Sequence, residues 1–281
     1  MPEIAPEAAV AALEIAQKSQ SPWERIYGSA AARRIMLLVV LALVWEFYAR
    51  WLANPLLAPT FSATLNALVS SFASGALSRA LWFSLAMLAK GYAAGLILAA
   101  MLTAFASASR IGADLLETLT AMFNPLPSIA LLPLAMIWFG LGDASVIFVL
   151  IHAVLWPVAL NTHAGFRAVS PTWRMVGQNY GLSGIRYVWR ILLPGAFPSI
   201  LTGLKAGWAF AWRTLIAAEL VFGVSSGSGG LGWFIFERKN QLLIPEVFAG
   251  LLTVILAGLL VENLIFRPVE NRTVRRWGMQ A

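Results

Sequence analysis

Apolar stretches about as long as a bilayer is thick recur along most of this chain of 281 residues. An α-helix needs about 20 predominantly apolar residues to cross the hydrocarbon core of a membrane. Charged residues make up only 12% of the chain, whereas a typical soluble domain has about 25%. The sequence therefore predicts an all-α integral membrane protein that lies mostly in membrane lipid.

Six segments fit membrane-spanning helices, and a polar loop at residues 161–197 separates the fourth from the fifth. The predicted spans are residues 35–52, 81–105, 115–139, 144–160, 200–222 and 247–266. They divide the chain into an N-terminal segment (1–34) with an interfacial helix, a transmembrane domain (35–266) and a basic tail (267–281).

The basic residues predict the orientation. With six spans, thirteen of the 20 Lys and Arg residues fall on one side. They are Lys18, Arg25, Arg33, Arg34, Arg110, Arg167, Arg174, Arg186, Arg190, Arg267, Arg272, Arg275 and Arg276. Basic residues collect in cytoplasmic loops, so both termini and the 161–197 loop are predicted to be cytoplasmic in a multi-pass protein of a bacterial inner membrane. The net charge of +7 then requires no nucleic-acid partner.

The central loop carries clear helix signals. Ser170 followed by Pro171 favours a helix start, and Gly181 suits the left-handed residue that ends a helix. Ser183 can cap a second helix over residues 184–192, which we expect to stop at Pro194 and Pro198. The pattern predicts two short helices hinged at a glycine. A passive connector is the alternative.

Several motifs in order carry a family resemblance. Gly181, nine residues and then Ile191-Leu192-Leu193-Pro194 resemble the cytoplasmic EAA loop of ABC-importer permeases, although Met175-Val176-Gly177 stand at the Glu-Ala-Ala positions. Other motifs resemble the permeases of the nitrate/sulfonate/taurine type. They are Pro125-Leu126-Pro127, Leu132-Pro133-Leu134, Trp138-Phe139-Gly140-Leu141-Gly142, Ala217-Ala218-Glu219, Ser225-Ser226-Gly227, Gly230-Leu231-Gly232 and Val247-Phe248-Ala249-Gly250.

The resemblance implies a type I importer permease fold of six transmembrane helices and a set of partners. Two permease copies, expected to be identical, would pair, dock onto cytoplasmic ABC ATPase subunits and receive a small anion such as nitrate, a sulfonate or taurine from a periplasmic or lipid-anchored binding protein. No ATP-binding motif occurs in the chain, so ATP would be held by the partner and the chain would bind no cofactor and be no enzyme. The implied ATPase-coupling residues are Gly177, Tyr180, Gly181, Leu182, Ser183 and Gly184.

Polar residues inside the predicted spans are candidates for a translocation path, because ionisable groups at membrane depth usually face a cavity or a partner. Arg213 lies near the middle of the fifth span and could line an anion path, form an ion pair or reach the membrane surface. Asn124-Pro125 interrupts the third span and favours a pore-lining role. His152 could contact substrate or simply pack. The predicted path residues are Arg213, Trp212, Asn124 and His152.

Glu219, near the outer end of the fifth span, is expected to have a structural role that ties the outer loop.

Other functions fit the sequence less well. A secondary transporter driven by an ion gradient would not need the paired-helix loop, and no second half repeats the first. An intramembrane enzyme or metal site would need a cluster of ligands or nucleophiles, yet only His152 and His163 occur and cysteine is absent.

Overall fold

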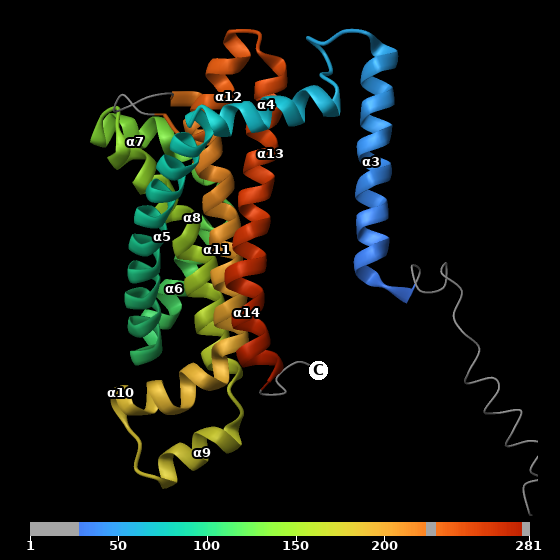
Figure 1. Cartoon of the computed structure of the whole chain (residues 1–281). Coiled ribbons are helices and arrows are strands. Elements are labelled where there is room, and N and C mark those ends of the chain that lie inside the picture. The colour runs from blue at the N-terminus through green and yellow to red at the C-terminus, as the bar shows by residue number, and fades with distance from the viewer. Residues whose placement is uncertain (1–27, 223–228, 277–281) are drawn as a thin grey trace, which may run out of the picture. The chain divides into compact units, whose positions relative to one another are not determined.

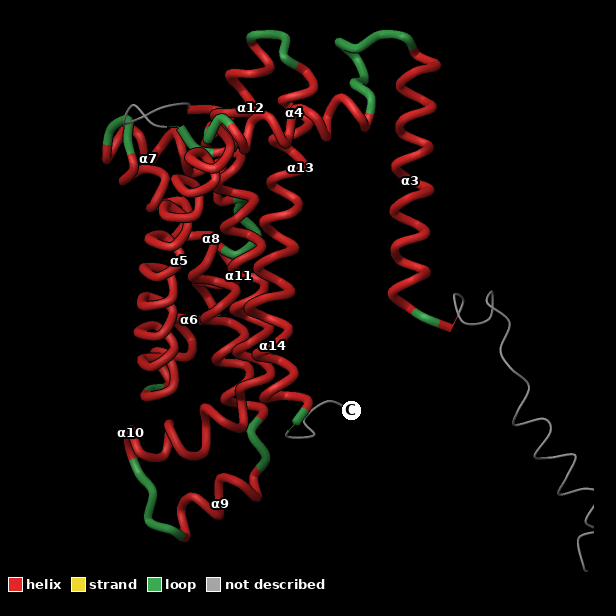
Figure 2. The backbone as a smooth tube through the Cα atoms, in the orientation of Figure 1, coloured by secondary structure: helices red, strands yellow, loops and turns green. Residues whose placement is uncertain are grey.

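The computed structural model describes residues 28–222 and 229–276, and within those ranges every regular element is a helix (Figures 1 and 2). The chain divides into two compact units, Met1–Ser62 and Ala63–Ala281. The interfacial helix predicted in the N-terminal segment falls within residues 1–27, which lie outside the described residues. The predicted all-helical fold is confirmed.

The first unit contains α3 (Ala30–Leu52) and the connection to α4 (Phe61–Ala73). Glu46 fixes this connection, because its carboxylate accepts hydrogen bonds from the backbone N–H of Ser62 at 3.0 Å and from Arg50 at 2.8 Å. Trp45 adds a second tie by donating its indole N–H to the carbonyl of Pro59 at 2.9 Å. Glu46 and Trp45 of α3 therefore fix the connection between α3 and α4.

The second unit is a bundle of helices with α8 (Asp143–Ala168) at its centre. More than half of the apolar window of α8 is buried, 56%, against 28% in α5 (Ala76–Ala108). The core consists of aliphatic side chains where α8 packs between α5 and α11 (Leu193–Phe222). The remaining elements are α6 (Arg110–Phe123), η1 (Ser128–Leu131), α7 (Leu132–Phe139), α9 (Pro171–Asn179), α10 (Gly184–Tyr187), η2 (Val188–Leu192), α12 (Leu231–Asn240), α13 (Ile244–Val261), η3 (Glu262–Phe266), α14 (Arg267–Glu270) and η4 (Asn271–Arg275).

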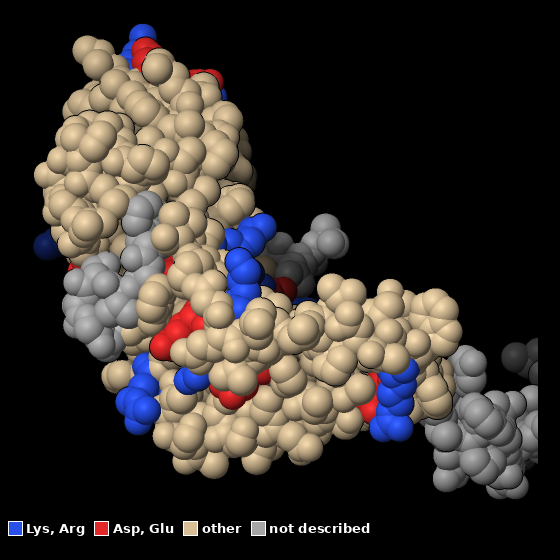
Figure 3. Space-filling model, turned by 90° about the horizontal axis from the view of Figure 1, so that it is seen from above, with Lys and Arg blue, Asp and Glu red and all other residues tan. Residues whose placement is uncertain are grey.

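Charge is distributed unequally between the two ends of this unit. Helices α9, α10 and α14 lie at one end, and α12 lies at the other (Figure 1). The elements at the α9 end carry nine arginines, namely Arg110, Arg167, Arg174, Arg186, Arg190, Arg267, Arg272, Arg275 and Arg276. Elements at the α12 end carry three basic residues, Arg79, Arg238 and Lys239, beside the acidic Glu237 and Glu246, and the view from that end shows a few blue and red groups on a mostly tan surface (Figure 3).

Four described helical segments are long and apolar enough to cross a membrane. They are Ala30–Leu52, Ala76–Ala108, Asp143–Ala168 and Ile244–Arg275. The bent pair Arg110–Phe123 and Ser128–Phe139 would make a fifth. Helix α11 has 30 residues but carries Lys205, Arg213 and Glu219, which lower its apolar character. The count of six spans stays a prediction.

The third predicted span, residues 115–139, is not one straight helix. Helices α6 and η1–α7 meet at a bend of 89° across the short break at residues 124–127. Pro125 and Pro127 lack the backbone N–H that would continue the helical hydrogen bonds, and the N–H of Leu126 turns back to the carbonyl of Phe123 at 3.1 Å. The interruption predicted at Asn124-Pro125 is confirmed.

Pro194 and Pro198 do not end the second loop helix, contrary to our expectation. The chain runs without interruption from α10 through η2 into α11, which contains both prolines. η2 is a π-helix in which the N–H of Leu193 bonds to the carbonyl of Val188. The wider π turn changes the hydrogen-bond register immediately before Pro194, where a continuing α-helix would meet the missing N–H and the ring.

Glycines set the close packing of α5 and α11 on α8. A Cβ at Gly91 would lie 2.5 Å from the Cβ of Leu150, and one at Gly203 would lie 2.9 Å from the Cβ of Asn161. Real Cβ atoms do not approach this closely, so only glycine permits these helix separations. Gly91 and Gly95 on α5, like Gly203 and Gly207 on α11, have the small-residue spacing that allows such close helix packing.

Glu219 joins three helices at the α12 end. Its carboxyl group accepts hydrogen bonds from Ser84 of α5 at 2.8 Å and from the N–H of Gly232 in α12 at 2.8 Å. The Ser84 hydroxyl in turn accepts the N–H of Leu231 at 2.9 Å. Glu219 is 6% exposed, so these bonds replace water for a buried polar group. Its predicted structural role is confirmed.

We expect Gly91→Ala and Gly258→Ala to shift stability in opposite directions. Alanine in a helix gains about 0.5–1 kcal/mol over glycine, and the nearest atom to a Cβ at Gly258 is 3.8 Å away. At Gly91 the overpacking cost of about 1–3 kcal/mol outweighs that gain. Thermal unfolding in detergent, followed by tryptophan fluorescence, measures both variants. Equal shifts would show that the α5–α8 contact does not limit stability.

Candidate functional site

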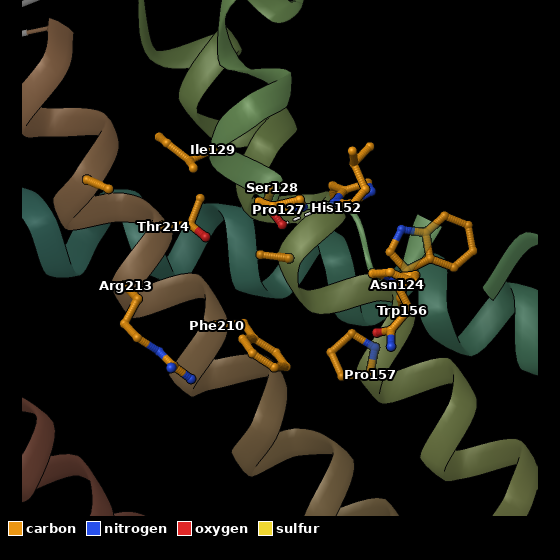
Figure 4. A pocket seen from close by; sticks show the side chains of 14 residues that line it. Asn124, Pro127, Ser128, Ile129, His152, Trp156, Pro157, Phe210, Arg213 and Thr214 are labelled. Carbon is orange, nitrogen blue, oxygen red and sulfur yellow. Dashed lines mark hydrogen bonds between the residues drawn. The ribbon is translucent and has the colours of Figure 1, made fainter. Parts of the chain in front are cut away.

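A cavity of about 410 Å³ opens where the α6–η1 break meets α8 and α11 (Figure 4). We call it the Arg213 cavity. Its lining residues are Asn124, Pro125, Leu126, Pro127, Ser128, Ile129, His152, Ala153, Trp156, Pro157, Phe210, Arg213, Thr214 and Ala217. Three of the four predicted path residues, Arg213, Asn124 and His152, therefore line one cavity.

Arg213 brings a positive charge to this cavity without a carboxylate partner among the described residues. Its Nε donates to the carbonyl of Ala209 at 2.9 Å, and its guanidinium carbon lies 5.1 Å from the centre of the Phe210 ring. These contacts hold the exposed side chain along α11 without neutralising its charge. A cationic group that lines a cavity without a carboxylate partner attracts anions.

Two further polar groups in the cavity lack partners. His152 Nδ1 lies 3.0 Å from the hydroxyl of Ser128, whereas His152 Nε2 and Trp156 Nε1 are buried without a hydrogen bond in the described chain. An indole N–H can only donate, so Trp156 requires a bound acceptor such as water or an anion. The Trp156 donor and the guanidinium together suit an acceptor-rich, negatively charged solute, to which His152 Nε2 can also donate when that nitrogen carries the proton.

Trp212, the fourth predicted path residue, does not line the Arg213 cavity. Its side chain is 8% exposed, belongs to the core and stacks on Trp208 with ring centres 6.3 Å apart. Adjacent residues on a helix point about 100° apart, which turns Trp212 away from the cavity that Arg213 lines. Sequence reasoning missed Trp156 instead, although it follows His152 by four residues and so shares its face of α8.

The loop between α8 and α11 has the predicted helix–glycine–helix geometry. The hydroxyl of Ser170 accepts the N–H of Trp173 at 3.3 Å and begins α9. After α9 the N–H of Leu182 bonds to the carbonyl of Gly177 at 3.0 Å, and Gly181 has φ of +67°. Gly184 also has positive φ, +55°. Glycine adopts this left-handed conformation without the steric cost of a Cβ. Ser183 stands at the start of α10 but makes no capping side-chain bond.

Close contacts make the loop a packed unit. A Cβ at Gly177 would lie 2.9 Å from Ile191 and 3.0 Å from the Tyr187 ring, so glycine allows α9 to pack on η2. Arg174 donates to the carbonyls of Phe166 and Val169 at the end of α8. Carbonyl groups at the end of a helix lack donors within that helix. The Arg174 guanidinium supplies these donors and thereby fixes α9 to α8.

Large apolar and aromatic side chains cover the outer surface of the loop. Tyr180 is 80% exposed, Ile185 74% and Trp189 67%, whereas Leu182 is half-buried. Exposed apolar groups that lie together mark an interaction surface. Sequence reasoning singled out Tyr180 and Leu182 but missed Ile185 and Trp189, whose spacing of four places them on one helical face.

Comparison with known proteins decides what these features belong to. Residues 91–269 match the family model described as binding-protein-dependent transport system inner membrane component. The chain belongs to this family. The match includes the residues of the Arg213 cavity and the whole loop, and the permease resembles curated proteins along most of its length.

Three relatives illustrate the similarity. The nitrate import permease protein NrtB of Synechocystis sp. is 29% identical over 256 residues, 89% of this chain and 92% of the relative. The taurine transport system permease protein TauC of Escherichia coli is 35% identical over 158 residues, 56% of each chain. The bicarbonate transport system permease protein CmpB of Synechococcus elongatus is 26% identical over 232 residues, 79% of this chain and 82% of the relative. The predicted nitrate/sulfonate/taurine type of ABC-importer permease is confirmed.

Arg174→Met should loosen the loop without affecting the spans. Hydrogen bonds from a charged donor contribute about 1.5–3 kcal/mol, and methionine keeps the apolar stem but removes both bonds to the end of α8. Faster amide exchange is expected in residues 166–180. Arg186→Met, an exposed arginine on the same loop, is the control and should leave exchange unchanged. Unchanged exchange in Arg174→Met would contradict the anchoring role.

Proposed function

We propose that the permease lines the membrane path of a small anion, and that the Arg213 cavity is part of this path. The proposal rests on the guanidinium of Arg213, which has no carboxylate partner among the described residues and lines the same cavity as the buried, unbonded Nε2 of His152 and Nε1 of Trp156. Nitrate, taurine and bicarbonate, in the names of the three relatives, all offer anionic oxygen atoms. The class of substrate is therefore a small oxyanion.

We propose six membrane spans with both termini and the α9–α10 loop in the cytoplasm. The spans would be α3, α5, the bent α6–α7 segment, α8, α11 and the run Ile244–Arg275. Helix α11 measures about 45 Å at 1.5 Å per residue, which exceeds the bilayer core of about 30 Å. The gathering of nine arginines at the α9 end supports the orientation. Residues 1–34 and 267–281 would then be cytoplasmic.

The loop is proposed to dock onto an ABC ATPase and to transmit its motion to the spans. The proposed coupling residues are Gly177, Tyr180, Gly181, Leu182, Ser183 and Gly184, and the exposed Ile185 and Trp189 extend the surface. Because η2 runs directly into α11, a displacement of the loop acts on a helix that lines the Arg213 cavity. ATP would be bound by the partner alone, and this chain would hold no cofactor.

The complex is proposed to contain two copies of the permease, two ATPase subunits and a substrate-binding protein at the α12 end. One chain offers one docking loop, whereas ABC ATPases close as pairs, so a second copy supplies the second loop. The sparsely charged α12 end suits a periplasmic face (Figure 3). Membrane lipid would cover the apolar faces of the outer helices.

Arg213→Gln should reduce uptake of the anion that the copurified binding protein holds by at least about tenfold, or about 1.4 kcal/mol. Glutamine removes the charge but keeps a polar side chain, so assembly should be unaffected. Arg213→Lys should retain much of the uptake. Arg79→Gln, which removes an exposed charge outside the cavity, is the control. Equal uptake by Arg213→Gln and Arg79→Gln would remove Arg213 from the path.

Gly181→Val should yield a permease that inserts normally but does not transport. No atom lies within 4 Å of a Cβ at this position, so the effect comes from the left-handed backbone, which costs about 1 kcal/mol or more with a Cβ. Gly181→Asn is the matched control, because asparagine tolerates this conformation. Retention of the ATPase on purification and ATP-driven uptake are the measurements. Normal values for Gly181→Val would show that the loop is not the coupling element.

A further inference from the structure

Three cavities follow one another along α8 and share lining residues. Beyond the Arg213 cavity lies one of about 700 Å³ between α6 and α8, which we call the Arg167 cavity. A third, of about 440 Å³ and called the Arg110 cavity, lies at the end of α8 next to α9 and η2. Asn124 and Pro125 line both the first and the second, and His163 and Arg167 line both the second and the third.

The chemistry of the series is uniform. The cavities contain four arginines, Arg213, Arg167, Arg110 and Arg174, and a single carboxylate, Glu117. Seven described buried side-chain atoms lack a hydrogen bond, and four of them belong to lining residues. These are Trp156 Nε1, His152 Nε2, His163 Nδ1 and Thr120 Oγ1. Uncompensated positive charge and unused hydrogen-bonding groups therefore continue from the middle of α8 to its end.

Asn124 occupies the junction of the first two cavities. It is the last residue before Pro125, at the C-terminal end of α6, where the chain bends by 89°. The preceding Phe123 stacks on Trp156 with ring centres 5.4 Å apart, and this contact holds the end of α6 on α8. Proline removes the helical hydrogen bond that would otherwise stiffen the junction.

We propose that the Arg213 and Arg167 cavities are two successive anion stations and that Asn124, at the α6–η1 break, forms the barrier between them. The inference rests on the proposed function and adds the position of the barrier and the second station. The Asn124 amide can donate hydrogen bonds to an anion that has shed its water. The Arg167 station then attracts the anion toward the α9 end.

Transport without leakage requires a movable barrier between the two stations, and a hinge at this junction can supply it. A path that is open at both ends would let ions leak, so the barrier must separate the stations whenever one of them faces solvent. The break joins α6 to η1 through residues 124–127, and the stacking of Phe123 on Trp156 and the bond between His152 and Ser128 connect its two ends to α8. A displacement of α8 or α11 would shift the side chain of Asn124 relative to both cavities.

The absence of cysteine from the chain allows a direct test by single-cysteine labelling. Ala217→Cys probes the Arg213 cavity alone, Ala121→Cys the Arg167 cavity alone, and Asn124→Cys the junction. Ala100→Cys, on α5 and outside all the cavities, is the control. The complete complex in proteoliposomes is treated with membrane-impermeant sulfonatoethyl methanethiosulfonate from either side, without nucleotide and after trapping with ATP and vanadate. Labelling is compared among variants that assemble with the ATPase and the binding protein, whether or not they transport.

We expect Ala217→Cys to react only from the side of α12 and Ala121→Cys only from the side of α9. Asn124→Cys should react from both sides, but from one side in each trapped state, and Ala100→Cys from neither. Reaction of Ala217→Cys and Ala121→Cys from the same side would overturn the proposal. So would reaction of Asn124→Cys from a single side in both states, or of Ala100→Cys at the same rate.

The reagent's charge tests the proposed function separately. An anionic reagent should modify Ala121→Cys at least about tenfold faster than its trimethylammonium counterpart, because clefts lined by one sign of charge concentrate the opposite ion. Equal rates with an unchanged side-specific pattern would refute the anion path but keep the barrier at Asn124. A tenfold preference without the side-specific pattern would refute the barrier and keep the anion path.

Discussion

The close contact of α8 with α5 and α11 is the constraint on which the rest of the second unit depends. Gly91 on α5 and Gly203 on α11 bring backbones so near to α8 that a Cβ at either position would overlap α8 atoms. This packing buries α8 along most of its length and leaves the surfaces near His152 and His163 for the cavities. It also gives α11, which continues from the loop without a break, a rigid partner against which to move.

Irregular backbone occurs next to the proposed functional parts, at the cavities and at the join between the loop and α11. Two cavities meet at the α6–η1 break. If the bent segment crosses the membrane as proposed, this is where irregular backbone is tolerated, because protein or a water-filled cavity covers it. The π-helix η2 carries the chain past Pro194 and keeps the loop continuous with α11. Glu219 shows the contrasting case, a buried polar group whose bonds to Ser84 and Gly232 are satisfied within the chain.

The sequence predicted what local rules determine. The long apolar helices follow from apolar length, the loop helices from Ser170, Pro171 and Gly181, and the break from Asn124-Pro125. It could not predict what depends on how helices face one another. Trp212 and Arg213 are neighbours in the chain, yet α11 turns one into the core and the other to the cavity. Trp156 became a candidate only when the packing left its N–H without a hydrogen-bond partner. The helix continues past Pro194 through a π turn, and no residue in the sequence predicts that turn.

Transport by the purified complex in proteoliposomes tests the account most directly. The permease, its ATPase and the loaded binding protein are reconstituted, and uptake of the bound anion is measured with ATP or with a proton or sodium gradient as the only energy source. If the loop couples the permease to a separate ATPase, as proposed, uptake occurs with ATP at the ATPase side and does not occur with a gradient alone. Gradient-driven uptake by the permease without its ATPase would contradict the account and establish a secondary transporter.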